Sequence, residues 1–128
     1  MKLLLDTHLL IWAAAGDARF PPAAKALLID PENDVAFSVV SIWEAAIKFG
    51  LNRADFPLHP ASLRNCLLAA GYQELQVTGQ HALAAADLPL LHRDPFDRLL
   101  LAQAAFEGFT LLTSNSTLAG YRGPVRLA

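Results

Sequence analysis

The amino-acid sequence predicts an α/β fold in which helices cover both faces of a mostly parallel sheet. Short apolar segments with the character of buried strands alternate with longer segments that carry helix-start and helix-stop residues. This alternation is typical of strand–helix–strand units, which place neighbouring strands parallel. Acidic residues follow the strands, and ligand sites in such sheets lie at the carboxyl ends of the strands.

Five strands are expected from runs of apolar, β-branched and aromatic residues. The first, Leu3-Leu4-Leu5, is continuously apolar, and the second is rich in valine and contains Phe37. The expected ranges in chain order are 2–5, 35–40, 74–77, 110–113 and 125–127.

Six helices are expected between these strands, and glycine or proline marks most of their ends. Gly16 closes the first helix, Pro21-Pro22 opens the second, Pro31 stops it, and Gly108 ends the last. The expected ranges in chain order are 7–15, 21–29, 41–49, 60–70, 80–87 and 94–106, with Gly50 and Gly71 after the third and fourth.

Length and composition agree with one compact domain over residues 1–128. Hydrophobic residues make up 54% of the chain and charged residues 17%, which is more apolar than an isolated domain of this size usually needs. We expect the surplus to cover a partner, and we expect a homodimer. The formal net charge of −2 supplies no overall basic field, so any attraction to a nucleic acid must be local.

The sequence favours a cytoplasmic location without a membrane segment. Asp6 interrupts the first apolar run, which also lacks a basic start, so this run is a poor signal peptide or membrane span. The single cysteine, Cys66, excludes an internal disulfide and fits a reducing compartment. We expect it to be a small core residue of its helix.

Four acids and one amide stand where strands end or helices begin. Asp6 directly follows the first strand, Glu44 lies in the first turn of the third helix, and Asn115 follows the fourth strand. Asp94 and Asp97 lie in the first turn of the last helix. Parallel strands bring the first three of these side chains to one edge of the sheet. Asp97 joins them only if the start of its helix faces the same edge.

Each of these residues also has a structural interpretation. Ser41 and Glu44 have the spacing of a capping box, and Asp94 before a proline is a good helix N-cap. Asp6 is placed to cap the first helix, and Asn115 is a common turn residue. Taken singly, each residue is better explained by its structural role.

The combination of acids favours a metal site. Asp6 is flanked by Leu3-Leu4-Leu5 and Leu9-Leu10-Ile11-Trp12, and a carboxylate in such apolar surroundings needs a partner or a cation. Mg²⁺ and Mn²⁺ suit carboxylate oxygens, and one or two such ions activate water for phosphodiester hydrolysis. Three acids from separate segments supply such a site without a cysteine or histidine cluster.

Four segments resemble those of PIN-domain proteins, and are most similar to those of the VapC-type toxins of bacterial toxin–antitoxin pairs. They are LLLDTHLLIW, SVVSIWEAAIKFG, HRDPFDRLLLAQA and LLTSN, in the family's order over nearly the whole chain. The resemblance implies a PIN-like three-layer α/β/α sandwich. It also implies a Mg²⁺- or Mn²⁺-dependent endoribonuclease, the toxin of such a pair, which a small cognate antitoxin inhibits.

The resemblance assigns roles to individual residues. The family's three acids fall on Asp6, Glu44 and Asp97, which are implied to be both metal ligands and catalytic residues. Asp94 is then an N-cap or a supporting residue. Family members often carry a fourth acid where this chain has Asn115, which can coordinate a metal but adds no negative charge. A second ion is therefore expected to bind more weakly, and one- and two-metal mechanisms both stay open.

Three residues near the acids are candidates for substrate binding. Lys48 lies four residues after Glu44, so an ion pair along the helix and a phosphate contact are equally good explanations. Arg98, near the start of the last helix, is expected to contact RNA phosphates. Thr7, like Thr113, is expected to hydrogen-bond an acid or a water.

Histidine and tryptophan residues are expected to have structural roles. His8 and His92 lie near the acids in sequence, but no cysteine or histidine partner stands at ligand spacing, so a zinc site is not expected. His81 is expected at the surface or at a helix cap. Trp12 and Trp43 are expected in the core.

Other functional classes fit the sequence less well. A receiver-like phosphotransfer module needs paired acids after the first strand and a late lysine, but the chain has Asp6 alone and no lysine after Lys48. A phosphatase of the haloacid type needs an aspartate where His8 stands. A PIN-like protein that binds a partner without cutting RNA remains the alternative, which the apolar surplus and Asn115 both favour.

Overall fold

A computed structural model describes residues 1–128, and its five strands form one sheet in the order β3-β2-β1-β4-β5. Every neighbouring pair is parallel, so the expected mostly parallel sheet is confirmed. The strands are β1 (Lys2–Leu5), β2 (Asp34–Ser38), β3 (Gln73–Leu75), β4 (Thr110–Thr113) and β5 (Val125–Leu127).

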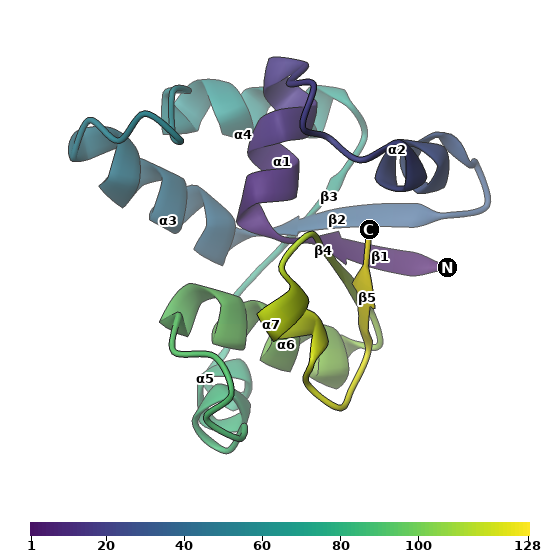
Figure 1. Cartoon of the computed structure of the whole chain (residues 1–128), viewed down its shortest axis with the longest axis vertical. Helices are drawn as coiled ribbons and strands as arrows, with labels where there is room; N and C mark the ends of the chain where they lie inside the picture. The colour runs from purple at the N-terminus through teal and green to yellow at the C-terminus, as the bar shows by residue number, and fades with distance from the viewer.

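Seven helices cover the two faces of this sheet, which gives the predicted α/β/α sandwich (Figure 1). One face carries α1 to α4 and the other carries α5 to α7. The helices are α1 (Thr7–Ala15), α2 (Pro22–Ile29), α3 (Val39–Gly50), α4 (Pro60–Ala69), α5 (Gly79–Ala86), α6 (Pro95–Glu107) and α7 (Ser116–Ala119).

The apolar core is divided into two clusters by the alternation of side chains along the strands. Leu3 and Leu5 of β1 point into the cluster beneath α1 and α4, where Leu63 packs. Leu4 points to the opposite face and packs in the cluster that contains Leu100 of α6. Both faces of the central strand are therefore buried, which explains its continuous apolar sequence.

The strand register sets the position of the first predicted acid. Leu5 pairs with Leu112, so the residues that follow them, Asp6 and Thr113, are neighbours at the carboxyl edge. The backbone N–H of Asp6 donates to Leu112 O at 3.0 Å, which extends the pairing to the acid itself. The central strand thus delivers Asp6 to the middle of this edge.

The start of α3 differs from the prediction, and the capping box at Ser41 is wrong. The strand β2 ends at Ser38, whose extended backbone (φ −91°, ψ 146°) and side chain cap the helix by accepting from Val40 N at 3.0 Å. Ser41 lies inside the helix, so Glu44 is in its second turn. Gly50 also lies inside the helix, and the turn to positive φ falls at Asn52 (φ 57°).

Several other predictions of element or burial are corrected. The short helix α7 was not predicted, β3 is shorter than expected, and α5 begins one residue earlier.

Cys66 is exposed and not a core residue, because the buried face of α4 is formed by Leu63 and Leu67. Trp43 is 60% exposed because Glu44 and Ala45 hold the buried face of α3. His81 is fully buried, although it does take part in a helix cap at Thr78. No helix has the length and apolar character needed to cross a membrane.

Candidate active site

Asp6 serves both as a helix cap and as a buried acid of the site. Its Oδ1 accepts from Leu9 N at 2.9 Å, which caps α1 as the structural interpretation required. Its Oδ2 accepts from the Thr113 hydroxyl at 2.5 Å. The side chain is 5% exposed, and burial raises the pKa of the carboxyl group despite these hydrogen bonds.

Glu44 is buried from the helix α3 and only half satisfied. One oxygen, Oε2, accepts from Lys48 Nζ at 2.6 Å, which is the ion pair expected from the four-residue spacing. The other oxygen, Oε1, is buried and has no hydrogen-bond partner. A buried carboxylate oxygen without a partner is costly, and a cation is the natural group to satisfy it.

Asp97 lies in the first turn of α6, beside a histidine. Asp94 caps the helix by accepting from Phe96 N and Asp97 N at 2.9 and 3.3 Å, as predicted. The Asp97 Oδ2 atom lies 2.8 Å from His92 Nε2. Burial, and next the charge of Asp94, raise the pKa of Asp97 to about 6, although the hydrogen bond from His92 acts in the opposite direction.

The three predicted acids are close enough to act on one another electrostatically. The charge of Glu44 raises the pKa of Asp6, and the charges of both raise the pKa of Asp97. The tightest group of potential ligands differs from the predicted set, because the ligand atoms of His92, Asp94 and Asp97 all lie within 4.8 Å of one another. Asp6 and Glu44 stand outside this group.

His92 has a place in this site that was not expected from the sequence. The signal that could have found it is its place five residues before Asp97 in the segment HRDPFD. The usual spacing of cysteine and histidine ligands does not reveal His92, because its neighbours are the carboxylates of Asp94 and Asp97 at the start of α6. His8, the other nearby histidine, lies 3.4 Å from Asp55 Oδ2 and packs against Phe56.

Two predicted substrate-binding residues are engaged elsewhere. The guanidinium of Arg98 turns away from the start of α6 and donates to the carbonyls of Ala85, Leu88 and Pro89. Thr7 is buried and donates to Ser41 Oγ at 3.0 Å, a contact between α1 and α3. Lys48 is 16% exposed and lies over the rings of Phe56 and Phe96, so it is a counter-ion of Glu44 within the site.

Asn115 supports the site through the backbone rather than through its own side chain. Its backbone N–H donates to Thr113 Oγ1 at 2.9 Å, and that hydroxyl in turn donates to Asp6. Its side-chain Oδ1 caps α7 by accepting from Thr117 N and Leu118 N. The position therefore orients Asp6 without adding a charge to the acidic group.

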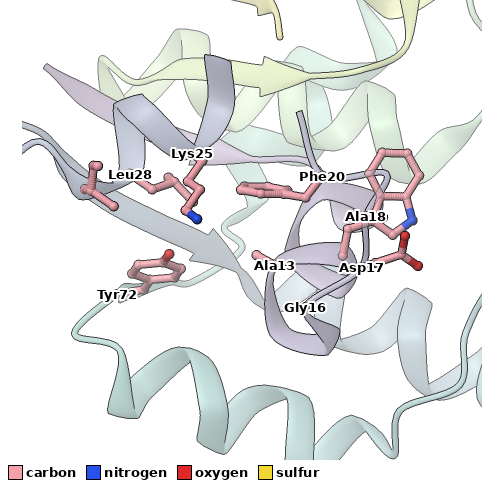
Figure 2. A pocket seen from close by; sticks show the side chains of 10 residues that line it. Ala13, Gly16, Asp17, Ala18, Phe20, Lys25, Leu28 and Tyr72 are labelled. Atoms are coloured by element: carbon pink, nitrogen blue, oxygen red, sulfur yellow. The ribbon is translucent and has the colours of Figure 1, made fainter. Parts of the chain in front are cut away.

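The largest pocket of the molecule lies away from these acids, between α1, α2 and Tyr72 (Figure 2). It has a volume of about 400 Å³, and seven of the ten residues that line it are hydrophobic. Phe20 and Leu28 form part of its apolar wall, and the side chain of Lys25 lies between them. None of the candidate site residues lines it.

The profile of the PIN domain matches residues 3–123. The chain belongs to the PIN-domain family. A relative, ribonuclease VapC22 of Mycobacterium tuberculosis, is 29% identical over 123 residues, which are 95% of this chain and 93% of the relative.

Two solved structures share the PIN fold over nearly their whole length. VapBC2 from Rickettsia felis, bound to a DNA fragment from its promoter, has a TM-score of 0.72 at 15% identity, covering 99% of this chain and 98% of that one. VapBC-5 from Mycobacterium tuberculosis, a member of the VapBC family of toxin–antitoxin systems, has a TM-score of 0.61 at 21% identity, covering 98% and 96%.

The residues of this PIN domain fit a hard divalent cation. Asp6, Glu44 and Asp97 offer carboxylate oxygens, which are the ligands that Mg²⁺ and Mn²⁺ prefer. Oε1 of Glu44 is unpartnered, and burial, more than the neighbouring charges, raises the pKa values of Asp6 and Asp97, so ionised carboxylates are costly here without a cation. A cation held among these carboxylates would remove both costs.

Proposed function

We propose that this PIN domain is a metal-dependent endoribonuclease and the toxin of a VapC-type toxin–antitoxin pair. The observation that carries the proposal is the buried, unpartnered oxygen of Glu44 within electrostatic reach of Asp6 and Asp97. The name of the relative VapC22, a ribonuclease, supports RNA as the substrate. Because its substrate is RNA, we also propose that the domain acts in the cytoplasm.

Asp6, Glu44 and Asp97 would hold one Mg²⁺ or Mn²⁺ ion, with Asp94 supporting the start of α6. When bound, the ion supplies a water of lowered pKa and positive charge for the transition state of phosphodiester hydrolysis. Leu9 N and the Thr113 hydroxyl each hold one oxygen of Asp6, so this carboxylate is oriented before a cation binds. Lys48 forms an ion pair with Glu44 and would contact a substrate phosphate at the edge of the site.

We propose one tightly bound ion rather than two. The amide of Asn115 brings no charge, and its oxygen is committed to the N-terminus of α7. A second ion would therefore be held by fewer charged oxygens than the first. The absence of a fourth charged ligand at Asn115 also favours the second candidate function, a PIN domain that binds a partner protein and cuts RNA weakly or not at all.

Cleavage in the presence and absence of divalent metal tests the proposed function. We expect purified protein to cut structured or single-stranded RNA with Mn²⁺ and to leave it intact with EDTA. A protein that binds Mn²⁺ and antitoxin but cuts no RNA would support the binding function. A protein that binds no divalent ion would contradict the metal-dependent mechanism.

We propose that an antitoxin segment occupies the pocket between α1 and α2. The pocket is apolar, and Lys25, which lines it, takes part in none of the ion pairs of the molecule, so an apolar helix or strand with an acidic residue fits it. Two of the solved structures of this fold are described as VapBC complexes bound to DNA, and another as a toxin–antitoxin complex. The antitoxin itself would be encoded next to this gene.

Ile29→Asp tests this groove, because Ile29 lines the pocket and is 73% exposed, so the change should leave the fold intact. We expect the affinity for the antitoxin encoded by the neighbouring gene to fall about tenfold or more, since a charge would be buried against an apolar segment. Ala26→Asp, an exposed position of α2 outside the pocket, is the matched control. Equal losses in both variants would exclude the groove.

We propose that the exposed side of α3 forms a homodimer interface. Trp43, Ile47 and Leu51 follow at intervals of four residues on this side and are 60%, 39% and 68% exposed. A stripe of this kind, with an aromatic residue at one end, is the composition found at the centres of interfaces.

Trp43→Lys is expected to convert a dimer into a monomer in size-exclusion chromatography with light scattering. The lysine would place two charges against each other across a symmetric interface. Leu68→Lys, which changes an exposed apolar residue of α4, should leave the dimer unchanged. A wild-type protein that is monomeric at high concentration would remove the dimer proposal.

A further inference from the structure

A single arginine holds the segment that leads from α5 into α6. The guanidinium of Arg98 donates to Ala85 O at 2.9 Å, to Leu88 O at 3.0 Å and to Pro89 O at 2.9 Å. Its Nη1 also donates to the hydroxyl of Tyr121 at 3.1 Å. Four charge-assisted hydrogen bonds from one side chain fix the path of this segment better than neutral contacts would.

The Tyr121 hydroxyl continues this network to the backbone of His92. It accepts from His92 N at 2.9 Å and donates to His92 O at 3.3 Å. Tyr121 is 4% exposed, and its ring packs in the core cluster beneath α6, so the hydroxyl has a fixed position. Both backbone groups of His92 are therefore held by one buried side chain from the loop between α7 and β5.

The imidazole of His92 then reaches the acid of α6. Its Nε2 lies 2.8 Å from Asp97 Oδ2, and the two side chains are 16% and 15% exposed. This contact orients one oxygen of Asp97 and leaves the other for a cation. A continuous path thus runs from Arg98 through Tyr121 and His92 to Asp97.

We propose that Tyr121 and Arg98 are positioning residues for the metal-dependent reaction, because they fix His92 and thereby the carboxylate of Asp97. The proposal rests on the function proposed above. Groups that orient a metal ligand without touching the metal commonly change metal affinity by about 10- to 100-fold. Arg98, which was expected from the sequence to contact RNA, acts on Asp97 indirectly, through Tyr121 and His92.

Mn²⁺ affinity measured by electron paramagnetic resonance titration tests the path. We expect Tyr121→Phe to lower the affinity about tenfold, since it removes only the hydroxyl and leaves the ring in the core. His92→Ala should cause a similar loss, and His92→Gln, which retains a donor, should recover part of it. Thr110→Val, which removes a half-buried hydroxyl at the opposite, amino end of β4, is the matched control and should bind as the wild type does.

A double-mutant cycle separates positioning from general destabilisation. If Tyr121 acts through His92, the Tyr121→Phe/His92→Ala variant should lose little more affinity than either single variant. In the metal-free protein, amide hydrogen exchange over residues 88–97 should be faster in Tyr121→Phe and Arg98→Lys than in the wild type. These readouts need no RNA cleavage.

The outcomes distinguish the two proposals. Wild-type affinity in Tyr121→Phe, or fully additive losses in the double variant, would overturn the positioning role while the metal site stands. A wild-type protein that binds no Mn²⁺ would overturn both the metal site and its positioning. If Tyr121→Phe does not fold, the comparison of His92→Gln with His92→Ala decides the case, and equal affinities in these two would overturn the path.

Discussion

Asp6→Asn is expected to lower Mn²⁺-dependent RNA cleavage by at least about a hundredfold while the protein stays folded. Asparagine keeps an oxygen for the N–H of Leu9, so α1 retains its cap. It removes the negative charge from the middle of the carboxyl edge, where the cation would bind. Loss of a ligand should cost at least as much as the roughly 10- to 100-fold loss that follows from disturbing a ligand's partner.

The measurement combines cleavage with folding and metal binding. Circular dichroism should match the wild type, and the Mn²⁺ titration should show a weakened site. Asp34→Asn is the matched control, because Asp34 is exposed at the opposite, amino end of β2. Cleavage that survives Asp6→Asn at the wild-type rate would show that the nuclease centre lies elsewhere.

The metal-free protein is expected to lose stability as the pH rises from about 4 to about 6. The pKa of Asp97 is about 6 in the folded chain against 3.8 for the free group, so the folded state binds more protons than the unfolded state in this window. The free energy of unfolding therefore falls with rising pH and stays reduced above pH 6. The effect is of order 2–3 kcal/mol for Asp97, and the raised pKa of Asp6 acts in the same direction.

Asp97→Asn isolates this contribution. In urea unfolding with EDTA, we expect the variant to be more stable than the wild type by about 2–3 kcal/mol at pH 7.5 and by only about 1 kcal/mol at pH 4.5. Mn²⁺ should restore the stability of the wild type at pH 7.5 and have little effect on the variant. A variant that is less stable than the wild type at pH 7.5 would contradict the raised pKa of Asp97.

The opposite signs of these two effects are characteristic of a functional site. Replacing a carboxylate of the group is expected to abolish activity and also to stabilise the metal-free fold. Residues that merely cap a helix behave differently, since their loss lowers stability. Asp6 and Asp97 therefore allow the structural and the functional interpretations to be separated by measurement.

The sequence by itself determined the fold class and the positions of the acids along it. The apolar run Leu3-Leu4-Leu5 is buried on both faces, as a central parallel strand requires. Asp6 and Asp94 are caps because a side-chain oxygen at the start of a helix meets unpaired N–H groups two or three residues ahead. Interactions of this kind span a few residues, so local sequence is enough to predict them.

Only the tertiary structure decided which neighbouring side chains work with the acids. Trp43 contacts Phe96 of α6 and is still 60% exposed. The guanidinium of Arg98 donates to backbone carbonyls of the segment before α6. His92 is held at the site by a hydrogen bond from its backbone N–H to the hydroxyl of Tyr121, which lies 29 residues further along the chain. Hydrogen bonds and burial across such separations depend on how the layers pack, and side-chain spacing along the sequence carries no record of them.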